Sequence, residues 1–403
     1  MRASLAVRAI LLMALIPFLT GCWNSRELKS LSIIGAIGID KMPDSQLYRV
    51  SFQIINPSTV ASAGGGTAAN PTAMPITVYT GTGRTIFEAI RKTSKISPRQ
   101  LFFSHIRLLV IGESLAREGV SNLFDFFERS HEIRLTTKLL VARGVQAEKL
   151  LQVLTPLEKI PANAAYGKLE STKKLWSESL DVGVDDVINT LISPSKQLLI
   201  SGARIVGRSE EGGKKSNLEN AKLPAEIEIK GIALFKDGRL ETWLDDDLAR
   251  GTLWIRDELK TTVIPIPCKR EEGIAAIEVT RSSTRVRASM EDGEPVFRVF
   301  VREEGNVNEV TCAVDLGKKE EILRYEDEWK AETERQIREA IRFAQSQSSD
   351  ILGFGEVLNR SHPKTWKKLE DRWSSIFARC KTEVRAEAYI RRSGMRLKPY
   401  IKE

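Results

Sequence analysis

The sequence predicts an α+β fold, a multi-domain body of mixed and antiparallel sheets with packed helices, anchored by an N-terminal lipid. In the first half of the chain, apolar β-branched strand patterns alternate with helical patterns. In the second half, alternating segments flank Asp-Gly turns, which are typical of antiparallel hairpins. A short apolar stretch that ends at Cys22 is typical of an exported, lipid-modified chain.

Composition excludes several classes of protein. The chain has 403 residues, of which 42% are hydrophobic and 28% are charged, so it has enough apolar mass for two or three globular domains. This balance excludes a disordered chain and a polytopic membrane protein. The net charge of +8 is spread over mixed signs without a long basic block, so no nucleic-acid partner is expected. The four cysteines, Cys22, Cys268, Cys312 and Cys380, are widely spaced, which argues against a disulfide-rich scaffold and a zinc finger.

Residues 1–21 have the pattern of a lipoprotein signal peptide. Arg2 and Arg8 precede an apolar run over 9–19, and small residues stand directly before Cys22. The run is too short for a bilayer-spanning helix, which needs about 20 apolar residues. Leu19 to Cys22 resembles the bacterial lipobox, in which the cysteine receives diacylglycerol and its new amino group a further chain such as palmitate. Cys22 is therefore the predicted lipidation site; an ordinary signal peptide with a chance cysteine is the alternative.

The first half of the mature chain is expected to alternate strands with helices. The predicted strands cover 31–40, 48–55, 76–81, 106–111, 132–142 and 197–206, and the predicted helical segments cover 85–94, 113–130 and 147–192. The uncharged segment 56–75 is rich in Ala, Gly and Ser. It predicts a mobile loop, because it cannot bury enough apolar surface to offset its ordering entropy.

A polar, Gly-rich segment, 207–224, predicts a linker or exposed loop. It would separate an N-terminal domain over 22–206 from a C-terminal domain over 225–395. A further boundary near 315 would divide the C-terminal domain into two subdomains, and 396–403 would form a tail. Hairpins are predicted around Asp237-Gly238 and Asp292-Gly293, a long helix over 320–345, a helix that begins after His362-Pro363, and a last strand over 382–392. The helical spacing of Trp366 and Trp373 favours core packing over a ligand platform.

Motifs for catalysis are missing from the sequence. His105, His131 and His362 belong to no HExxH pattern, and no GxSxG, SxxK or phosphate-binding GxxxxGK[ST] motif is present. Gly81–Arg84 could cradle an anion, although a strand-to-helix turn that needs glycine is the favoured interpretation. Asp245–Asp247 could bind calcium, but three acidic residues at a helix start are favourable without a metal. We therefore predict no catalytic, cofactor-binding or metal-binding residue and no enzyme, although buried acids that converge in space would escape this reasoning.

Several segments together resemble the Ger(x)C family of spore germination lipoproteins. Gly21–Leu28 is similar to the start of the mature family sequence, with Asn24 where the family usually has Asp. The other similar blocks are Gly35–Lys41, Ser104–Glu113 with Leu115–Gly119, Lys230–Lys236, and Asp350–Gly355 followed by His362-Pro363, Trp366 and Trp373. Their order and spacing agree with the family from Cys22 to about Gly394.

The resemblance implies a non-catalytic C subunit of a nutrient germinant receptor. Such a subunit works beside a polytopic A subunit and a transporter-like B subunit, as a lipoprotein on the outer face of the spore inner membrane. Two other classes remain open. A solute-binding lipoprotein of a transporter would have a cleft between two similar α/β lobes, and the antiparallel second half argues against it. A cell-envelope enzyme would bring carboxylates or a Ser/His pair together in a cleft.

Overall fold

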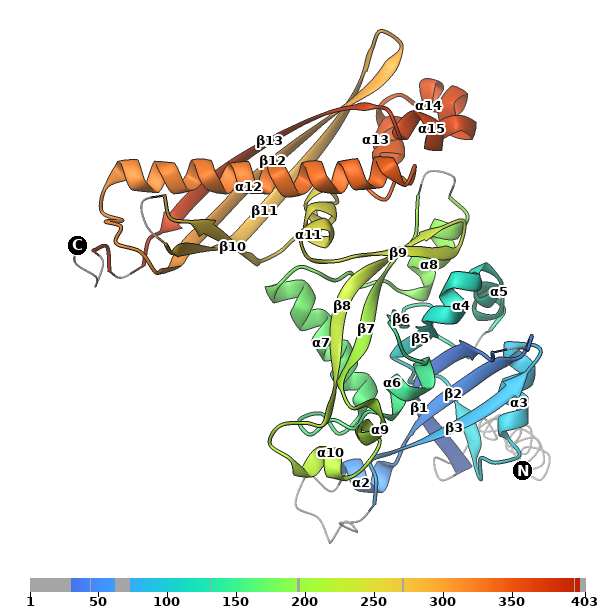
Figure 1. Cartoon of the computed structure of the whole chain (residues 1–403). Coiled ribbons are helices and arrows are strands. Elements are labelled where there is room, and N and C mark those ends of the chain that lie inside the picture. The colour runs from blue at the N-terminus through green and yellow to red at the C-terminus, as the bar shows by residue number, and fades with distance from the viewer. Residues whose placement is uncertain are drawn as a thin grey trace, which may run out of the picture.

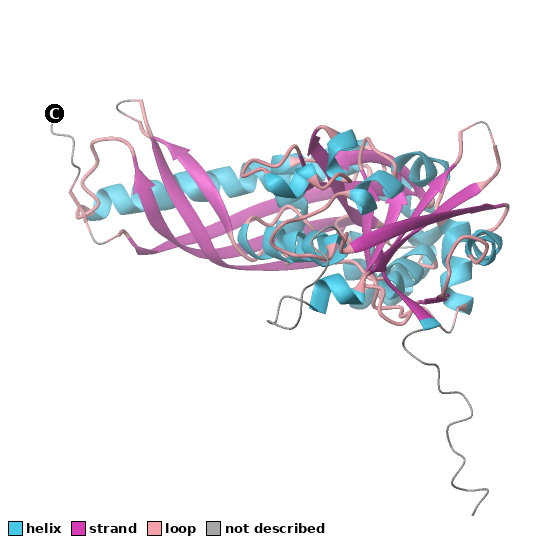
Figure 2. Ribbon diagram, turned by 90° about the horizontal axis from the view of Figure 1, so that it is seen from below, coloured by secondary structure: helices cyan, strands magenta, loops and turns pink. Residues whose placement is uncertain are grey.

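The computed structural model describes residues 30–43, 45–61, 73–130, 132–193, 196–269, 272–394 and 396–398. They form two bodies stacked end to end, the first built around a nine-stranded sheet and the second around a four-stranded sheet with a long helix (Figure 1). The long strands of the second body extend away from the first (Figure 2). This architecture confirms the predicted α+β class. Among the described residues, no helix combines the length and apolar composition that a bilayer-spanning segment needs.

The first sheet is mixed, with parallel strands at its centre and antiparallel strands at both edges. Its strands are β1 (Leu31–Lys41), β2 (Tyr48–Ile55), β3 (Ile76–Gly83), β4 (Gln100–Phe102), β5 (Leu108–Gly112), β6 (Lys138–Ala142), β7 (Leu199–Gly207), β8 (Ala225–Lys236) and β9 (Arg239–Leu244). They are ordered β3-β2-β1-β5-β6-β7-β8-β9, and β4 pairs with the start of β1. The central strands β1, β5, β6 and β7 run parallel. Their near-continuous burial is typical of parallel strands that are covered on both faces.

Helices cover both faces of this sheet. The first face carries α3 (Ile86–Thr93), α4 (Glu113–Glu118), α5 (Ser121–Arg129) and α8 (Val184–Leu191), and the second carries α6 (Ala147–Gln152) and α7 (Pro161–Leu175). Two apolar cores result, one on each face. The short helix α2 (Pro57–Ala61) begins the segment predicted as a mobile loop, of which 62–72 lie outside the described residues. The strand predicted over 132–142 is shorter than expected, because β6 begins only at Lys138.

The segment predicted as a linker, 207–224, stays within the first body. It forms α9 (Ser209–Gly212) and α10 (Ser216–Glu219) between β7 and β8, which pair antiparallel along most of their length. Asn217 is fully buried, and its side chain bonds the Leu154 carbonyl and both backbone polar groups of Ala225. The β8–β9 hairpin around Asp237-Gly238, which was expected to open the second unit, therefore extends the first sheet. The pairing of β8 with β7 determines that this hairpin belongs to the first body, and the polar composition of the loop does not reveal that pairing.

The second body begins with α11 (Asp246–Ile255). Its sheet has the order β10 (Thr262–Pro267), β11 (Ile274–Glu291), β12 (Glu294–Val310) and β13 (Lys381–Arg392), and its other helices are α12 (Lys319–Ser346), α13 (Phe354–Ser361), α14 (Pro363–Leu369), a 3₁₀ turn (Glu370–Arg372) and α15 (Trp373–Phe377). Asp292 and Gly293 both have positive φ, 50° and 83°, which confirms the predicted hairpin turn. Helix α12 returns the chain so that β13 pairs parallel with β12. Residues on both sides of the boundary suggested near 315 therefore share one sheet and one core.

The C-terminal helical segment differs from the single pattern expected after His362-Pro363, because a 3₁₀ turn interrupts it. The prediction about its aromatic residues is confirmed. Trp366 and Trp373 are 3% and 4% exposed, and their rings meet edge to face, 5.2 Å between centroids. Both side chains are core residues of the second body.

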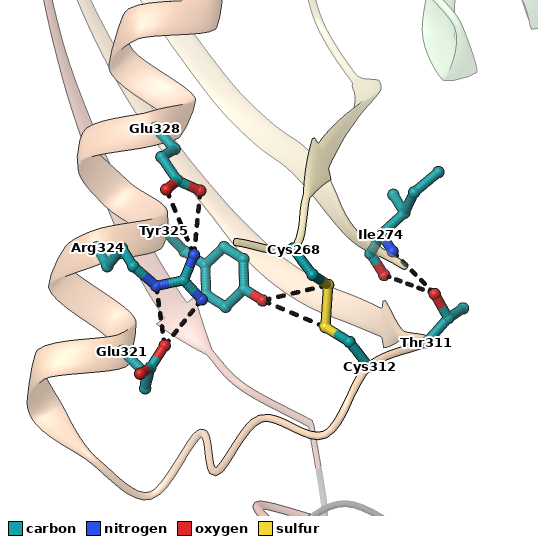
Figure 3. The surroundings of a disulfide bond; sticks show 8 residues. All are labelled: Cys268, Ile274, Thr311, Cys312, Glu321, Arg324, Tyr325 and Glu328. Carbon is teal, nitrogen blue, oxygen red and sulfur yellow. Dashed lines mark hydrogen bonds and ion pairs between the residues drawn. A yellow bond between two sulfur atoms is a disulfide. The ribbon is translucent and has the colours of Figure 1, made fainter. Parts of the chain in front are cut away.

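A disulfide joins Cys268 and Cys312 across the base of the second sheet (Figure 3). The sequence analysis did not predict this pair, since the two cysteines are 44 residues apart and meet only because β10, β11 and β12 pair in order. The Tyr325 hydroxyl lies 3.8 Å from both sulfur atoms. A disulfide is expected in an exported chain, because export places the protein outside the reducing cytosol. Cys380 is a free, buried thiol, and burial raises its pKa to about 12.

Candidate functional site

The predicted site residues do not converge in the described structure. Cys22 and His131 lie outside the described residues, so no contact can be assigned to them. His105 is exposed beside Phe102, whereas His362 ends α13 and contacts the Ser361 hydroxyl at 3.0 Å. Within the described residues, no group of three or more His, Cys, Asp or Glu side chains is arranged to hold a metal ion.

The three consecutive aspartates lie at the start of α11, as predicted. They form hydrogen bonds and ion pairs with basic side chains of the protein. Asp245 receives two hydrogen bonds from Arg143, at 2.6 and 2.8 Å. This guanidinium holds the pKa of Asp245 below its usual range. Asp246 pairs with Lys230 at 2.5 Å. These carboxylates therefore connect α11 to the first sheet.

The carboxyl ends of β1 and β5, where open α/β sheets commonly place their active sites, are closed by internal contacts. Asp40 ends β1 and accepts hydrogen bonds from the backbone N–H groups of Ala147 and Glu148, at 2.8 and 3.1 Å, which fixes the start of α6. A Cβ atom at Gly112 would lie 2.1 Å from Asp40 Oδ1. Burial raises the pKa of Asp40. Asp40 and Gly112, each from one of the blocks quoted above, therefore act in packing.

The same holds for two other blocks. Gly231 has φ of +76°, and a Cβ atom there would lie 2.5 Å from Asp245 Oδ1. Asp350 is buried and accepts hydrogen bonds from the Phe354 and Gly355 N–H groups and from Trp373 Nε1, at 3.0, 2.6 and 2.9 Å. Burial raises the pKa of this carboxyl. Asp350 therefore holds the start of α13 against the aromatic core.

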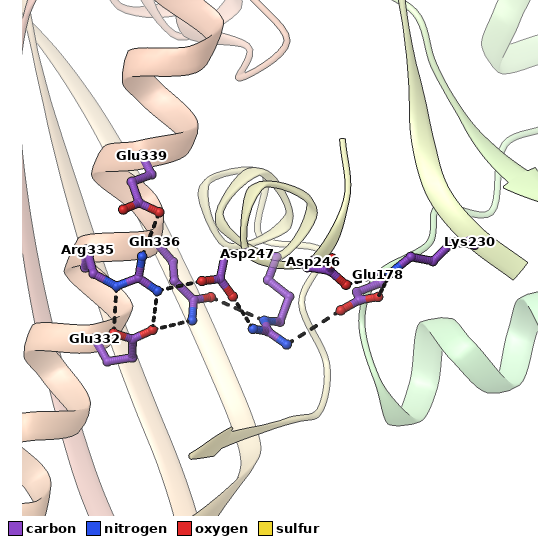
Figure 4. A network of polar contacts seen from close by, with 9 residues as sticks. Glu178, Lys230, Asp246, Asp247, Glu332, Arg335, Gln336 and Glu339 are labelled. Atoms are coloured by element: carbon purple, nitrogen blue, oxygen red, sulfur yellow. Dashed lines mark hydrogen bonds and ion pairs between the residues drawn. The ribbon is translucent and has the colours of Figure 1, made fainter. Parts of the chain in front are cut away.

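A polar network that includes Glu178, Asp247 and Arg335 lies between the two bodies (Figure 4). Arg250 of α11 contacts residues of both bodies within it. The residue is 8% exposed. Its guanidinium pairs with Glu178 of the first body at 3.6 Å, bonds Asp247, and donates to Gln336 of α12 at 3.3 Å. Burial raises the pKa of Glu178, so removal of Arg250 would leave a poorly solvated carboxylate.

Arg335 extends this network along α12. It contacts Asp247, Glu332 and Glu339 at 2.5, 2.6 and 2.7 Å. The hydrogen bonds that Arg335 donates to Glu332, Asp247 and Glu339 raise the already high pKa of the guanidinium. The network therefore connects the first body through α11 to the long helix, and the sequence analysis missed it because its members are far apart in the chain.

A groove of about 700 Å³ lies between α3 and α5 on the first face of the sheet. Its lining combines apolar side chains with four arginines and two carboxylates. The apolar residues are Ile86, Phe87, Ile90, Leu101, Phe103, Phe126 and Ile133, and the charged residues are Arg84, Arg91, Arg99, Arg129, Asp125 and Glu132. Its volume falls within the range of about 300–1,000 Å³ that is typical of small-molecule sites. The groove is the candidate site on this chain.

The groove walls are aromatic and its rim is basic. Phe87 is 53% exposed, and its ring lies 6.5 Å from the ring of Phe126, centroid to centroid. The Arg91 guanidinium lies 4.8 Å from the centre of the Phe87 ring. Arg129 pairs with Asp125 at 2.9 Å. The wall and the rim together combine exposed apolar surface with positive charge.

The turn that leads into α3 uses two of its backbone N–H groups within the protein. The Arg84 N–H donates to Glu88 Oε2 at 2.7 Å, and the Glu88 N–H donates to Thr85 Oγ1 at 3.1 Å, so Thr85 caps the start of α3. A Cβ atom at Gly81 would lie 2.3 Å from the Ala89 carbonyl oxygen, so glycine is needed for close packing. The favoured interpretation of this segment, a strand-to-helix turn, agrees with this geometry.

The sequence analysis missed the groove. The spacing of Phe87 and Arg91 is the one signal that it overlooked, because positions i and i+4 share one side of a helix. The contribution of Arg99 and Phe126 comes from other elements, so only the fold could reveal it.

Comparisons with known proteins agree with the earlier resemblance. Residues 24–205 match the family model described as spore germination protein N-terminal domain. Residues 230–394 match the model described as spore germination B3/GerAC like, C-terminal. The division between the two models falls near the predicted linker, whereas the sheet of the first body continues to Leu244.

Full-length relatives lead to the same family, and a solved structure supports the fold. Spore germination protein KC of Bacillus subtilis (strain 168) is 33% identical over 396 residues, which cover 97% of this chain and 96% of that protein. Spore germination protein B3 of the same organism is 24% identical, with coverage of 89% and 90%. The crystal structure of the GerBC protein matches with a TM-score of 0.56 and 20% identity, over 88% of this chain and 96% of that chain, which supports the fold. The chain therefore belongs to the Ger(x)C family of spore germination proteins.

Proposed function

We propose that this chain is the C subunit of a spore nutrient germinant receptor and is required for the germination response. The observation that carries the proposal is its full-length relationship to spore germination protein KC, together with matches to both domains of the family. The proposed subunit acts through contacts with the membrane-spanning A and B subunits and catalyses no reaction.

In this proposal, acylated Cys22 holds the body on the outer face of the spore inner membrane. The lipobox-like sequence at Leu19–Cys22 supports this attachment. Two or three acyl chains would give stable binding, because a single chain gives only marginal, reversible binding.

The internal pairing of polar side chains supports a role in contacts. Asp40, Asp245 and Asp350 accept hydrogen bonds from groups of the protein, so their carboxylates stabilise the fold. The transporter alternative is not favoured, because the two sheets differ in strand number and order and so do not form two similar lobes.

The test is genetic. Deletion of the gene in its sporulating host should abolish the response to one set of nutrients, and the wild-type gene should restore it. Cys22→Ala should weaken the response and release the protein from the membrane fraction, and mass spectrometry of the N-terminal peptide should detect the diacylglyceryl group on the wild type. His105→Ala, His131→Ala and His362→Ala should retain the response.

Two results would contradict the proposal. Normal germination of the deletion strain with every nutrient, in a host without a related receptor, would reject the receptor role. A histidine variant that is folded and abundant but unresponsive would favour catalysis or a metal site instead.

A further inference from the structure

The groove between α3 and α5 combines two chemistries that one class of ligand would satisfy. Its lining contains apolar side chains, and the half-exposed Phe87 leaves an apolar wall open to solvent. At its rim, Arg84, Arg91 and Arg99 are exposed, and none of the three forms an ion pair with a carboxylate of the described chain. Such a site suits a molecule with an apolar chain and an anionic head group.

The groove lies close in the chain to the predicted membrane anchor, which favours a ligand from the membrane. Gln100 lines the groove and pairs with Leu31, the first residue of β1. Nine peptide units join Leu31 to Cys22, so a fully extended link spans at most about 30 Å. An acyl group on Cys22 would therefore keep the groove within about 30 Å of the bilayer.

Charge favours an anionic bilayer in the same way. Four arginines line the groove against two carboxylates, Asp125 and Glu132, and one of the arginines already pairs with Asp125. Basic residues near an anionic lipid surface each contribute roughly a fivefold gain in affinity. Arg91 also covers the Phe87 ring, so head group and acyl chain would be bound side by side.

We propose that the groove binds an anionic phospholipid of the membrane that holds the anchor. The phosphate contacts Arg84, Arg91 and Arg99, and an acyl chain lies against Phe87 and Phe126. The proposal rests on the lipid attachment of the proposed function. It adds that this face of the first body rests on the bilayer, with the second body directed away from α3 and α5.

The experiment uses the full mature protein, purified from its host membrane into phosphatidylcholine nanodiscs that contain a few per cent photoactivatable phosphatidylglycerol. Cross-linked peptides are mapped by mass spectrometry. Peptides that contain α3 and α5 should be labelled, and an equal amount of photoactivatable phosphatidylcholine should label them at least tenfold less. Free glycerol phosphate should not compete at concentrations equal to the lipid, which separates a lipid from a soluble phosphate.

Three variants sharpen the test. Arg84→Gln/Arg91→Gln/Arg99→Gln should reduce groove labelling at least tenfold, whereas the three corresponding Arg→Lys substitutions should retain it, because lysine keeps the charge. The matched control removes three arginines from the exposed face of the second sheet, and these are Arg285, Arg287 and Arg385. Changed to Gln, they should leave the labelling of the groove unchanged.

Several outcomes would overturn the proposal. Equal labelling by the two lipids, unchanged labelling of the Gln variant, or labelling confined to the second body would each do so. Cross-links from the groove to a receptor subunit in place of lipid would indicate a protein occupant. The intact mass of the protein reports acylation of Cys22 independently. If the protein is not acylated but its groove is still labelled from added vesicles, only the predicted lipid attachment of Cys22 is rejected. If the protein is acylated but its groove is not labelled, only the proposed lipid site is rejected.

Discussion

Glu303 of β12 is a buried carboxyl group whose protonation should control the stability of the second body. Its side chain is fully buried between the sheet and two helices. It accepts hydrogen bonds from Trp254 Nε1 of α11 at 2.7 Å and from the Thr333 hydroxyl of α12 at 2.8 Å. Burial raises its pKa from 4.5 to about 7, and no cation pairs with it among the described residues.

The sign of the effect follows from this pKa. Below pH 4.5, Glu303 is protonated in both the folded and the unfolded chain, and it does not alter the stability. Between pH 4.5 and 7, the unfolded chain loses the proton and the folded chain keeps it, so the free energy of unfolding falls as pH rises. Above pH 7 the loss is constant at about 3 kcal/mol, since each pKa unit corresponds to about 1.4 kcal/mol.

Glu303→Gln should remove this dependence, because Gln resembles the protonated acid in shape and stays neutral. The free energy of unfolding of the variant, relative to wild type, should be about 2.5 kcal/mol higher at pH 8 than at pH 5, so the variant gains stability as pH rises. Urea denaturation of the chain from residue 23 onward, followed by tryptophan fluorescence at both pH values, measures this difference. Other titrating groups cancel in the comparison.

The neighbouring Glu304 supplies the matched control. It lies on the opposite side of β12, and its hydrogen bond from Arg391, at 2.8 Å, lowers its pKa. Glu304→Gln should therefore lose a little stability at pH 8 instead of gaining it. A difference between Glu303→Gln and wild type that does not change with pH would refute the reasoning.

Three further predictions concern stability and are tested by denaturant unfolding. Cys268→Ser/Cys312→Ser should lower the free energy of unfolding by about 4 kcal/mol, because the disulfide closes a loop over a separation of 44 residues. A reducing agent should lower the free energy of unfolding of the wild type but not that of the variant. Gly355→Ala should cost at least 1–3 kcal/mol, because its Cβ atom would lie 2.8 Å from Trp373 Nε1; no loss would show that the aromatic core yields easily. Arg250→Met should cost up to about 3 kcal/mol, since it removes the guanidinium at 3.6 Å from buried Glu178 and leaves Lys230, at 4.0 Å, as the remaining cation beside that carboxylate; a second change of Glu178 to Gln should recover part of the loss.

The elements that were predicted correctly are those whose conformation is determined by their own residues. The strand pattern over 31–40 corresponds to β1, and the Asp-Gly turns have the positive φ angles that such turns require. Strand β10 was not predicted, because it contains Pro265 and Pro267, which disfavour strands. It forms nevertheless because it lies at the edge of the sheet, where a missing N–H can be tolerated.

Long-range pairing accounts for the rest of the missed structure. The parallel pairing of β12 with β13 spans the whole of α12, and the sequence alone shows only that 382–392 alternates. The Cys268–Cys312 bond and the contact of Arg250 with Glu178 depend on the same kind of distant pairing. Single residues in these contacts carry no local signal, because their partners are 44 and 72 positions away.

The blocks that identify the family do not contain the groove residues that are proposed to bind lipid. Gly112, Gly231 and Gly355 stand where a side chain would meet a hydrogen-bonded carboxylate or an indole ring, so these positions are needed to build the two bodies. Arg84 and Arg91 lie outside every quoted block, and neither side chain forms an ion pair with a carboxylate of the described residues, although the Arg91 guanidinium covers the Phe87 ring. A substitution at a block glycine should therefore reduce the amount of folded protein, whereas one at a groove arginine should leave the amount unchanged and alter lipid contact. Resemblance in the blocks thus establishes the fold, and the function of this chain has to be sought on the surfaces between them.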